Sequence, residues 1–111
     1  MPTLSETETA RKIANLNDLH RRSGRFIVTQ GVAALAPDQQ LALARLVMEF
    51  SDFTEDNDPY GDHDFGAVDL DGVKYFWKIV AYDLAMEMGS EDATDPSLTR
   101  RALTVMRADE W

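Results

Sequence analysis

The sequence predicts an α+β fold, in which a small antiparallel sheet of three to four strands packs against about three helices. Two observations predict this class. Apolar residues recur at helical spacing in the N-terminal half, whereas residues 65–82 contain two β-prone runs around the turn pair Asp71-Gly72, which is typical of a hairpin. Since one face of that hairpin is apolar, helices are expected to cover it. The 111 residues are expected to form a single domain, 1–111, with residues 1–8 flexible.

The first expected element is a helix over residues 5–22. Acidic residues lie near its start and basic residues near its end, which suits the helix dipole, and Gly24 is a natural stop. Its apolar stripe is expected to consist of Ala10, Ile13, Leu16 and Leu19.

A strand over residues 25–29 follows, because this run is β-branched and aromatic. Gly31 allows a bend, and the pattern leaves open whether residues 32–35 continue the strand. Pro37 fits the first turn of a second helix. Its apolar positions follow the i, i+3, i+4, i+7 pattern at Leu43, Leu46, Val47 and Phe50.

The hairpin has a two-residue turn, and this fixes which residues face each other. Leu70 should lie opposite Val73 and Asp69 opposite Lys74. The face expected in the core holds Val68, Leu70, Val73, Tyr75, Trp77 and Ile79. The mixed face holds Phe65, Asp69, Lys74, Phe76, Lys78, Val80 and Tyr82.

The C-terminal third is expected to hold an edge strand or loop at residues 85–94 and then a final helix. Asp95 and Pro96 form an N-cap and first-turn pair. The apolar stripe of this helix, running toward Trp111, is expected to consist of Leu98, Ala102, Val105 and Met106.

Charge and composition exclude several classes of protein. The net charge of −9 disfavours direct binding to nucleic acid or to an anionic membrane, and favours a basic partner. Without cysteine, the chain has no disulfide, thiolate metal site or cysteine nucleophile. No apolar run approaches the roughly 20 residues of a membrane span, and no targeting segment is evident, so a cytoplasmic location is expected.

The loop at residues 54–64 is rich in acids and in turn-forming residues. Its oxygen donors could surround a divalent cation, and the candidate ligands are Asp56, Asp58, Asp62, His63 and Asp64. A calcium loop that starts at Asp56 fails at position 12, where Ala67 replaces the bidentate Glu. The alternative is that these residues only build turns, so no cofactor is predicted.

His63 is the candidate for acid–base work, because neighbouring carboxylates would raise its pKa and hold one tautomer. A structural histidine bonded within the loop is the competing interpretation. No phosphate loop or nucleophile elbow is present, which favours a protein that is not an enzyme.

A resemblance to a known family is carried by Phe53-Thr54, by the run Asp-Asn-Asp-Pro-Tyr-Gly-Asp-His-Asp-Phe-Gly from Asp56 to Gly66, by Phe76-Trp77-Lys78-Ile79, and by Thr99 to Thr104. From about Ile13 almost to its end, the chain resembles an uncharacterised family of small bacterial proteins, classified only as a domain of unknown function. The resemblance implies a bacterial or mobile-element origin and one compact domain, and it brings no catalytic residues.

The sequence therefore favours an acidic binding or regulatory protein that engages a basic surface of a partner protein. In its sharpest form, the acids imitate phosphates and inhibit a defence or DNA-processing complex. The expected contact residues are Glu55, Asp56, Asp58, Tyr60, Asp62 and Asp64. Two alternatives stay open: a metal-dependent hydrolase that uses residues 56–64, and an interaction domain whose acidic loop is purely structural.

Overall fold

A computed structural model describes residues 5–111. The elements are α1 (Glu6–Arg22), β1 (Phe26–Val28), α2 (Gln30–Ala33), α3 (Pro37–Met48), β2 (Phe65–Leu70), β3 (Val73–Tyr82), β4 (Arg100–Arg107) and a 3-10 turn, η1 (Ala108–Glu110). Residues 1–4 of the segment expected to be flexible lie outside the described residues, and residues 6–8 are helical. The α+β class is confirmed.

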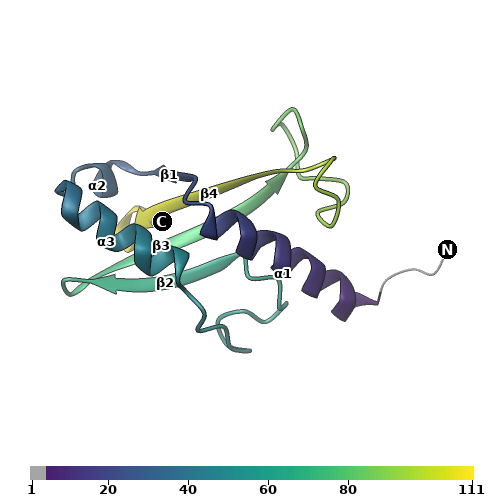
Figure 1. The fold of residues 1–111 in the computed structure, drawn as a ribbon, viewed down its shortest axis with the longest axis horizontal. Helices are drawn as coiled ribbons and strands as arrows, with labels where there is room; N and C mark the ends of the chain where they lie inside the picture. The colour runs from purple at the N-terminus through teal and green to yellow at the C-terminus, as the bar shows by residue number, and fades with distance from the viewer. Residues whose placement is uncertain (1–4) are drawn as a thin grey trace.

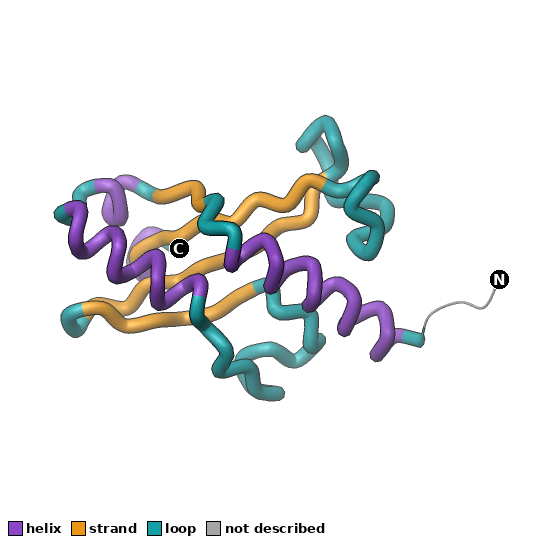
Figure 2. Tube along the Cα trace, viewed as in Figure 1, coloured by secondary structure: helices purple, strands orange, loops and turns teal. Residues whose placement is uncertain are grey.

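The four strands form one sheet in the order β1-β4-β3-β2 (Figures 1 and 2). β2 and β3 form the expected antiparallel hairpin and β4 is antiparallel to β3, but β1 runs parallel to β4. The sheet is therefore mixed. A parallel pair needs a long connection, and here α2, α3 and the hairpin lie between the two strands in the chain.

The hairpin has the predicted register, from Leu70 opposite Val73 to Gly66 opposite Trp77. Asp71 and Gly72 both have positive φ, 52° and 79°, as a two-residue turn of type I′ requires. The predicted core face is buried at its centre, whereas Val73 beside the turn is 40% exposed, contrary to the prediction. The side chains of Tyr75, Trp77 and Ile79 are buried, whereas the opposite face holds exposed and half-buried residues.

The predicted C-terminal helix is wrong, because residues 100–107 form β4, which pairs with residues 75–82 of β3. Asp95 caps only a local turn, where its Oδ1 accepts from the Ser97 N–H at 2.9 Å. Leu103 and Val105 are buried and Thr104 between them is half-buried, which is the alternation of a strand. Pairing with β3 therefore outweighs the local helix-start signal.

The two segments left open are also settled. Residues 83–99 form a loop with an isolated bridge between Tyr82 and Gly89. Val32 and Ala33 belong to the short helix α2, and Ala34 and Leu35 form the turn that follows it. The side chain of Glu110 holds the start of α2, since it accepts from the Thr29 hydroxyl at 2.7 Å and from the Gly31 N–H at 2.9 Å.

Helices α1 and α3 cover one face of the sheet (Figure 1). The core between the layers consists of Val32, Leu43, Val47, Tyr75, Trp77, Ile79, Leu103 and Val105. The stripe predicted for α1 has the wrong phase, because Leu19 is 68% exposed while Ala14, Asn17 and Arg21 are buried. The buried polar pair on α1 is explained by the loop described below.

The opposite face of the sheet carries a smaller aromatic cluster of Phe65, Phe76 and Trp111. The ring centroids lie 5.2 to 5.7 Å apart. Across the described residues, no helix is both long and apolar enough to cross a membrane.

Candidate functional site

The acidic loop between α3 and β2 passes beside α1 (Figure 1). Its first half consists of turns held by its own polar groups. The Asn57 side chain accepts from the Thr54 N–H at 2.8 Å and donates to the Asp52 carbonyl at 2.7 Å, and the Asp58 N–H donates to the Thr54 carbonyl at 2.8 Å. These turns bring the second half of the loop, residues 58–64, under the helix.

The carboxylates of Asp58, Asp62 and Asp64 converge in this second half, with one oxygen of each within 4.8 Å of the others. Asp58 is 8% exposed, and Asp62 and Asp64 are half-buried. Burial, which is the largest cause, together with the charge and hydrogen bond of Asp64 and the charge of Asp58, raises the pKa of Asp62 to about 6. The ionised form of Asp62 is therefore disfavoured beside its two neighbours, because like charges at this separation repel.

His63 lies between this cluster and α1, in a left-handed conformation with φ 56°. Its Nδ1 is 3.0 Å from Asp18 Oδ1, and its Nε2 is 3.6 Å from Asp58 Oδ2. A carboxylate only accepts, so the contact with Asp18 places a proton on Nδ1. The imidazole stacks on Phe53 with ring centroids 3.6 Å apart. The His63 ring is thus held by Phe53 on one face, by the hydrogen bond from Nδ1 to Asp18, and by the contact of Nε2 with Asp58.

Arg21 of α1 supports the same arrangement from inside the core. Its side chain is fully buried, donates to Asp18 Oδ1 at 2.9 Å and to the Phe50 carbonyl at 3.0 Å, and lies over the rings of Phe53 and Trp77. Asp18 therefore joins a buried cation to His63, and the imidazole, the aspartate and the guanidinium form one connected network.

Asn17 fixes the loop to both the helix and the sheet. Its Nδ2 donates to the Asp62 carbonyl at 2.8 Å, and its Oδ1 accepts from Arg101 Nε at 2.7 Å. Sequence reasoning missed Asn17, Asp18 and Arg21. The signal that could have found them is the polar pair at i and i+4, Asn17 and Arg21, on a helix whose other buried position is Ala14.

Above this network, a groove of about 940 Å³ separates the N-terminal half of α1 from residues 55–63. Four acids line it, Glu6, Glu55, Asp58 and Asp62, against one arginine, Arg11. Tyr60 also lines it and is 82% exposed. The groove thus combines excess negative charge with an accessible aromatic ring, which is the combination that attracts a cationic group.

The structure divides the predicted contact residues into two sets. Glu55, Asp56 and Tyr60 are exposed, so their side chains are accessible to a partner. Asp58, Asp62 and Asp64 face the inner cluster, and Asp58 is too buried for surface contact. The predicted row of accessible acids is therefore shorter than the sequence suggested.

The inner cluster has the chemistry to hold a hard cation, because three carboxylates in one small volume are the ligands that calcium and magnesium prefer. His63 contacts Asp58 and Asp18, and Asp56 is exposed on the loop. A cation would therefore be held by Asp58, Asp62 and Asp64 rather than by all five candidate ligands.

The raised pKa of Asp62 makes a prediction about stability. A folded-state pKa of about 6, against an ordinary value of 3.8, means that the native state binds this proton more tightly than the unfolded state does. Stability should therefore fall as pH rises from 3.8 to about 6. Asp62→Asn should remove this fall and raise the free energy of unfolding at pH 7 by about 1 kcal/mol, a value reduced for partial exposure.

Urea denaturation of both proteins across this pH range measures the effect. Asp56→Asn, an exposed acid of the same loop, is the matched control and should change stability little. A less stable Asp62→Asn protein at pH 7 would contradict the mutual repulsion of these carboxylates.

The fold and site together define an α+β domain with a mixed four-stranded sheet and an acidic groove beside a carboxylate cluster. The model of the family described as "Protein of unknown function (DUF3768)" matches residues 28–110, and the chain belongs to this family. The resemblance to a domain of unknown function is thus confirmed. The matched range includes the acidic loop but not α1, which supplies the other wall of the groove. No curated protein and no solved structure matches the chain.

Proposed function

We propose that this protein is a non-enzymatic binding protein whose acidic groove takes a cationic segment of a partner protein. The observation that carries the proposal is the lining of the groove, which holds the exposed acids Glu6 and Glu55 together with exposed Tyr60. The carboxylates would attract lysine or arginine side chains, and the tyrosine ring offers them a cation–π surface. The net charge of −9 adds long-range attraction for a basic partner.

In the finer form of this proposal, the partner is a nucleic-acid-binding complex, such as a defence or DNA-processing complex, that the protein inhibits. The acids accessible for this role are Glu6, Glu55 and Asp56, since Asp58 is buried and Asp62 and Asp64 lie in the inner cluster. The row of carboxylates that imitates phosphates would therefore be only about as long as one loop. Tyr60 would add contact area.

The groove is tested with a labelled oligo-arginine peptide, whose binding is followed by fluorescence anisotropy. Glu6→Gln with Glu55→Gln should weaken binding about fivefold, because two exposed ion pairs contribute about 0.5 kcal/mol each. The matched control is Glu49→Gln with Glu91→Gln, which changes the net charge equally at exposed acids that do not line the groove. Binding should also weaken between about 20 mM and about 300 mM salt, because screening shortens the reach of surface charges.

If both double variants lose the same affinity for the peptide, only the total charge matters, and the groove is not the binding site. Tyr60→Ala separates the aromatic contribution, since it should weaken binding without changing the salt dependence. For the finer form, host proteins retained on the immobilised protein, but not on the groove variant, should elute with duplex DNA. If duplex DNA releases none of them, the partner does not use its nucleic-acid surface here.

A second candidate function, a metal-dependent hydrolase, is favoured by one observation, the convergence of Asp58, Asp62 and Asp64 beside His63. Here the carboxylates would hold a divalent cation, and the imidazole, oriented by Asp18, would transfer a proton. Calcium, magnesium, manganese or zinc at millimolar concentration should then raise the melting temperature, and Asp62→Asn should abolish the rise. If no metal shifts the melting temperature, this candidate fails while the groove proposal stands.

A further inference from the structure

The second hollow of the molecule, of about 630 Å³, lies along the first residues of β4, beside the C-terminal end of α1 and the start of β1. Five consecutive residues of the chain, Thr99 to Leu103, line it. A run of neighbours can line one hollow only if the hollow follows the side of the strand. The hollow therefore lies along a strand edge.

This edge is open because β1 is shorter than β4. β1 begins at Phe26, opposite Leu103, whereas β4 begins at Arg100. Residues 100–102 pair with β3 on one side only, and we call their other side the open edge of β4. The Thr29 N–H donates to the Val105 carbonyl, so the backbone groups of Val105 face β1. Since strand geometry repeats every two residues, the N–H and C=O of Arg101 point to the same side, beyond the end of β1.

Basic side chains surround the open edge, although the protein as a whole is acidic. Arg25, Arg100, Arg101 and His20 line the hollow, and no carboxylate is among the described residues that do so. Arg101 donates to two neutral acceptors, Asn17 Oδ1 at 2.7 Å and the Ala93 carbonyl at 2.6 Å. Within residues 5–111, Arg25 and Arg100 form no salt bridge. These charges are therefore uncompensated.

The pKa of His20 agrees with an excess of positive charge around the hollow. Burial lowers the pKa of His20, and the charges of Arg101 and Arg25 lower it further. His20 thus lies where positive charge is already in excess, and an incoming carboxylate would relieve this repulsion.

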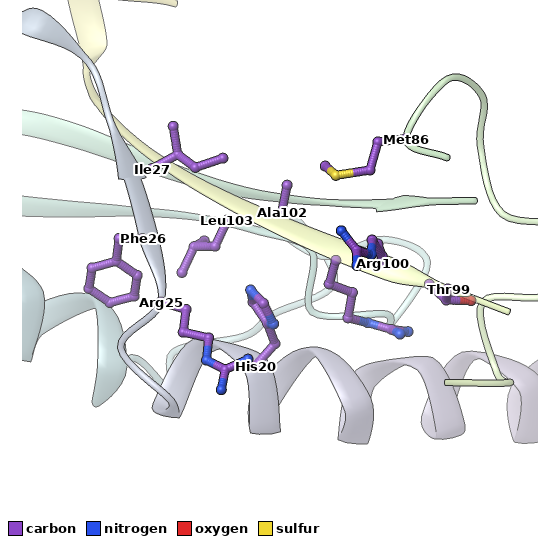
Figure 3. A pocket seen from close by; sticks show the side chains of 10 residues that line it. His20, Arg25, Phe26, Ile27, Met86, Thr99, Arg100, Ala102 and Leu103 are labelled. Carbon is purple, nitrogen blue, oxygen red and sulfur yellow. The ribbon is translucent and has the colours of Figure 1, made fainter. Parts of the chain in front are cut away.

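Basic and apolar side chains line this hollow from the two sides of β4 (Figure 3). His20, Arg25 and Phe26 lie on the side of α1, and Ile27, Ala102 and Met86 lie on the other. Ile27 is 55% exposed and Met86 43% exposed. An added strand would send alternate side chains to these two sides. One side would meet the cations beside α1, and the other would meet an apolar wall with Arg100 at its end.

We propose that the open edge of β4 binds an extended acidic segment of a partner protein as an additional strand in line with β1. The Arg101 backbone supplies the strand hydrogen bonds, the side chains of Arg25 and Arg100 receive carboxylates, and Ile27 and Met86 receive apolar side chains. Charge complementarity selects an acidic segment, and the backbone edge selects an extended one. This surface is separate from the acidic groove and does not depend on the function proposed for it.

The probe is a labelled peptide of alternating glutamate and valine, with anisotropy as the readout. Arg25→Gln with Arg100→Gln should weaken binding about tenfold, because charge-assisted hydrogen bonds from arginine are among the stronger polar contacts. Arg22→Gln with Arg45→Gln is the control, since both arginines are exposed and outside the hollow. The control pair should change affinity by no more than about twofold, the effect of a distant charge screened by salt.

Three further measurements address the strand geometry. The same peptide with N-methylated backbone should lose binding, because it cannot donate to the edge. In hydrogen exchange, the Arg101 amide should become protected on binding, whereas the Val105 amide, already facing β1, should not change. Met86→Ser should weaken binding of the glutamate–valine peptide more than it weakens binding of a peptide in which serine replaces valine.

The proposal is overturned if the N-methylated peptide or a lysine–valine peptide binds as tightly as the glutamate–valine peptide. It is overturned as well if the two arginine double variants lose the same affinity. It is also overturned if single-stranded DNA binds this edge more tightly than the peptide. If the protein dimerises with concentration, and Arg25→Gln with Arg100→Gln abolishes the dimer, the occupant is a second copy rather than a separate partner.

Discussion

Arg21→Met should lower the free energy of unfolding by about 3 kcal/mol, the largest single effect expected in this protein. Arg21 is 1% exposed, and its guanidinium contacts Asp18, the Phe50 carbonyl and two aromatic rings. Methionine fills much of the volume but removes the charge. Asp18 would then keep only His63 as a partner, and the Phe50 carbonyl would lose its side-chain donor.

Urea denaturation followed by circular dichroism measures this effect. Arg22→Met is the matched control, because Arg22 is the next residue of the same helix and is exposed. It should change stability by less than about 0.5 kcal/mol. Equal stabilities of the two variants would show that the buried guanidinium contributes nothing beyond the packing of an apolar side chain.

Gly66→Ala should lower the free energy of unfolding by about 2 kcal/mol or more, the usual scale of overpacking. A Cβ at this position would overlap the Trp77 indole, with Cε2 at 2.6 Å and Cζ2 at 2.7 Å. Trp77 is fully buried at the centre of the core, so the ring cannot move without displacing its neighbours. The strand backbone itself tolerates alanine, and the cost is therefore steric.

Gly89→Ala is the control, since nothing lies within 4 Å of the position that its Cβ would take and its φ is not positive. It should be neutral within about 0.5 kcal/mol. Trp77→Phe, made together with Gly66→Ala, should cost less than the sum of the two single changes, because the smaller ring leaves room for the methyl group. Strict additivity in thermal or urea unfolding would contradict the proposed clash.

The sequence predicted best where the determinants are local. Asp71 and Gly72 specify the turn, and the turn specifies the register of all six hairpin pairs. The C-terminal strand shows the opposite case. Asp95 and Pro96 resemble a helix start, yet β3 offers an unpaired edge, and residues 100–107 complete it. Only the tertiary partner decides between the two outcomes, and single-sequence patterns do not contain it.

The candidate site divides in the same way. Composition located the acidic loop and named Asp58, Asp62, His63 and Asp64. Composition could not show whether these side chains point inward or toward solvent, because the contact between His63 and Asp18 joins residues 45 positions apart. That contact, with buried Arg21 behind it, turns part of the acidic loop inward. Accessibility of the acids is thus a property of the helix packing and not of the loop sequence.

The pairing of β1 with β4 has a consequence for how the chain folds. The hairpin and its neighbour β4 join segments that are closer in sequence, but Phe26 meets Leu103 only after most of the chain has been closed into a loop. The entropy of that closure is lost before β1 gains anything from it, so β1 is expected to dock late, after the three-stranded nucleus has formed. Weakening β1 should then accelerate unfolding and leave the refolding rate nearly unchanged.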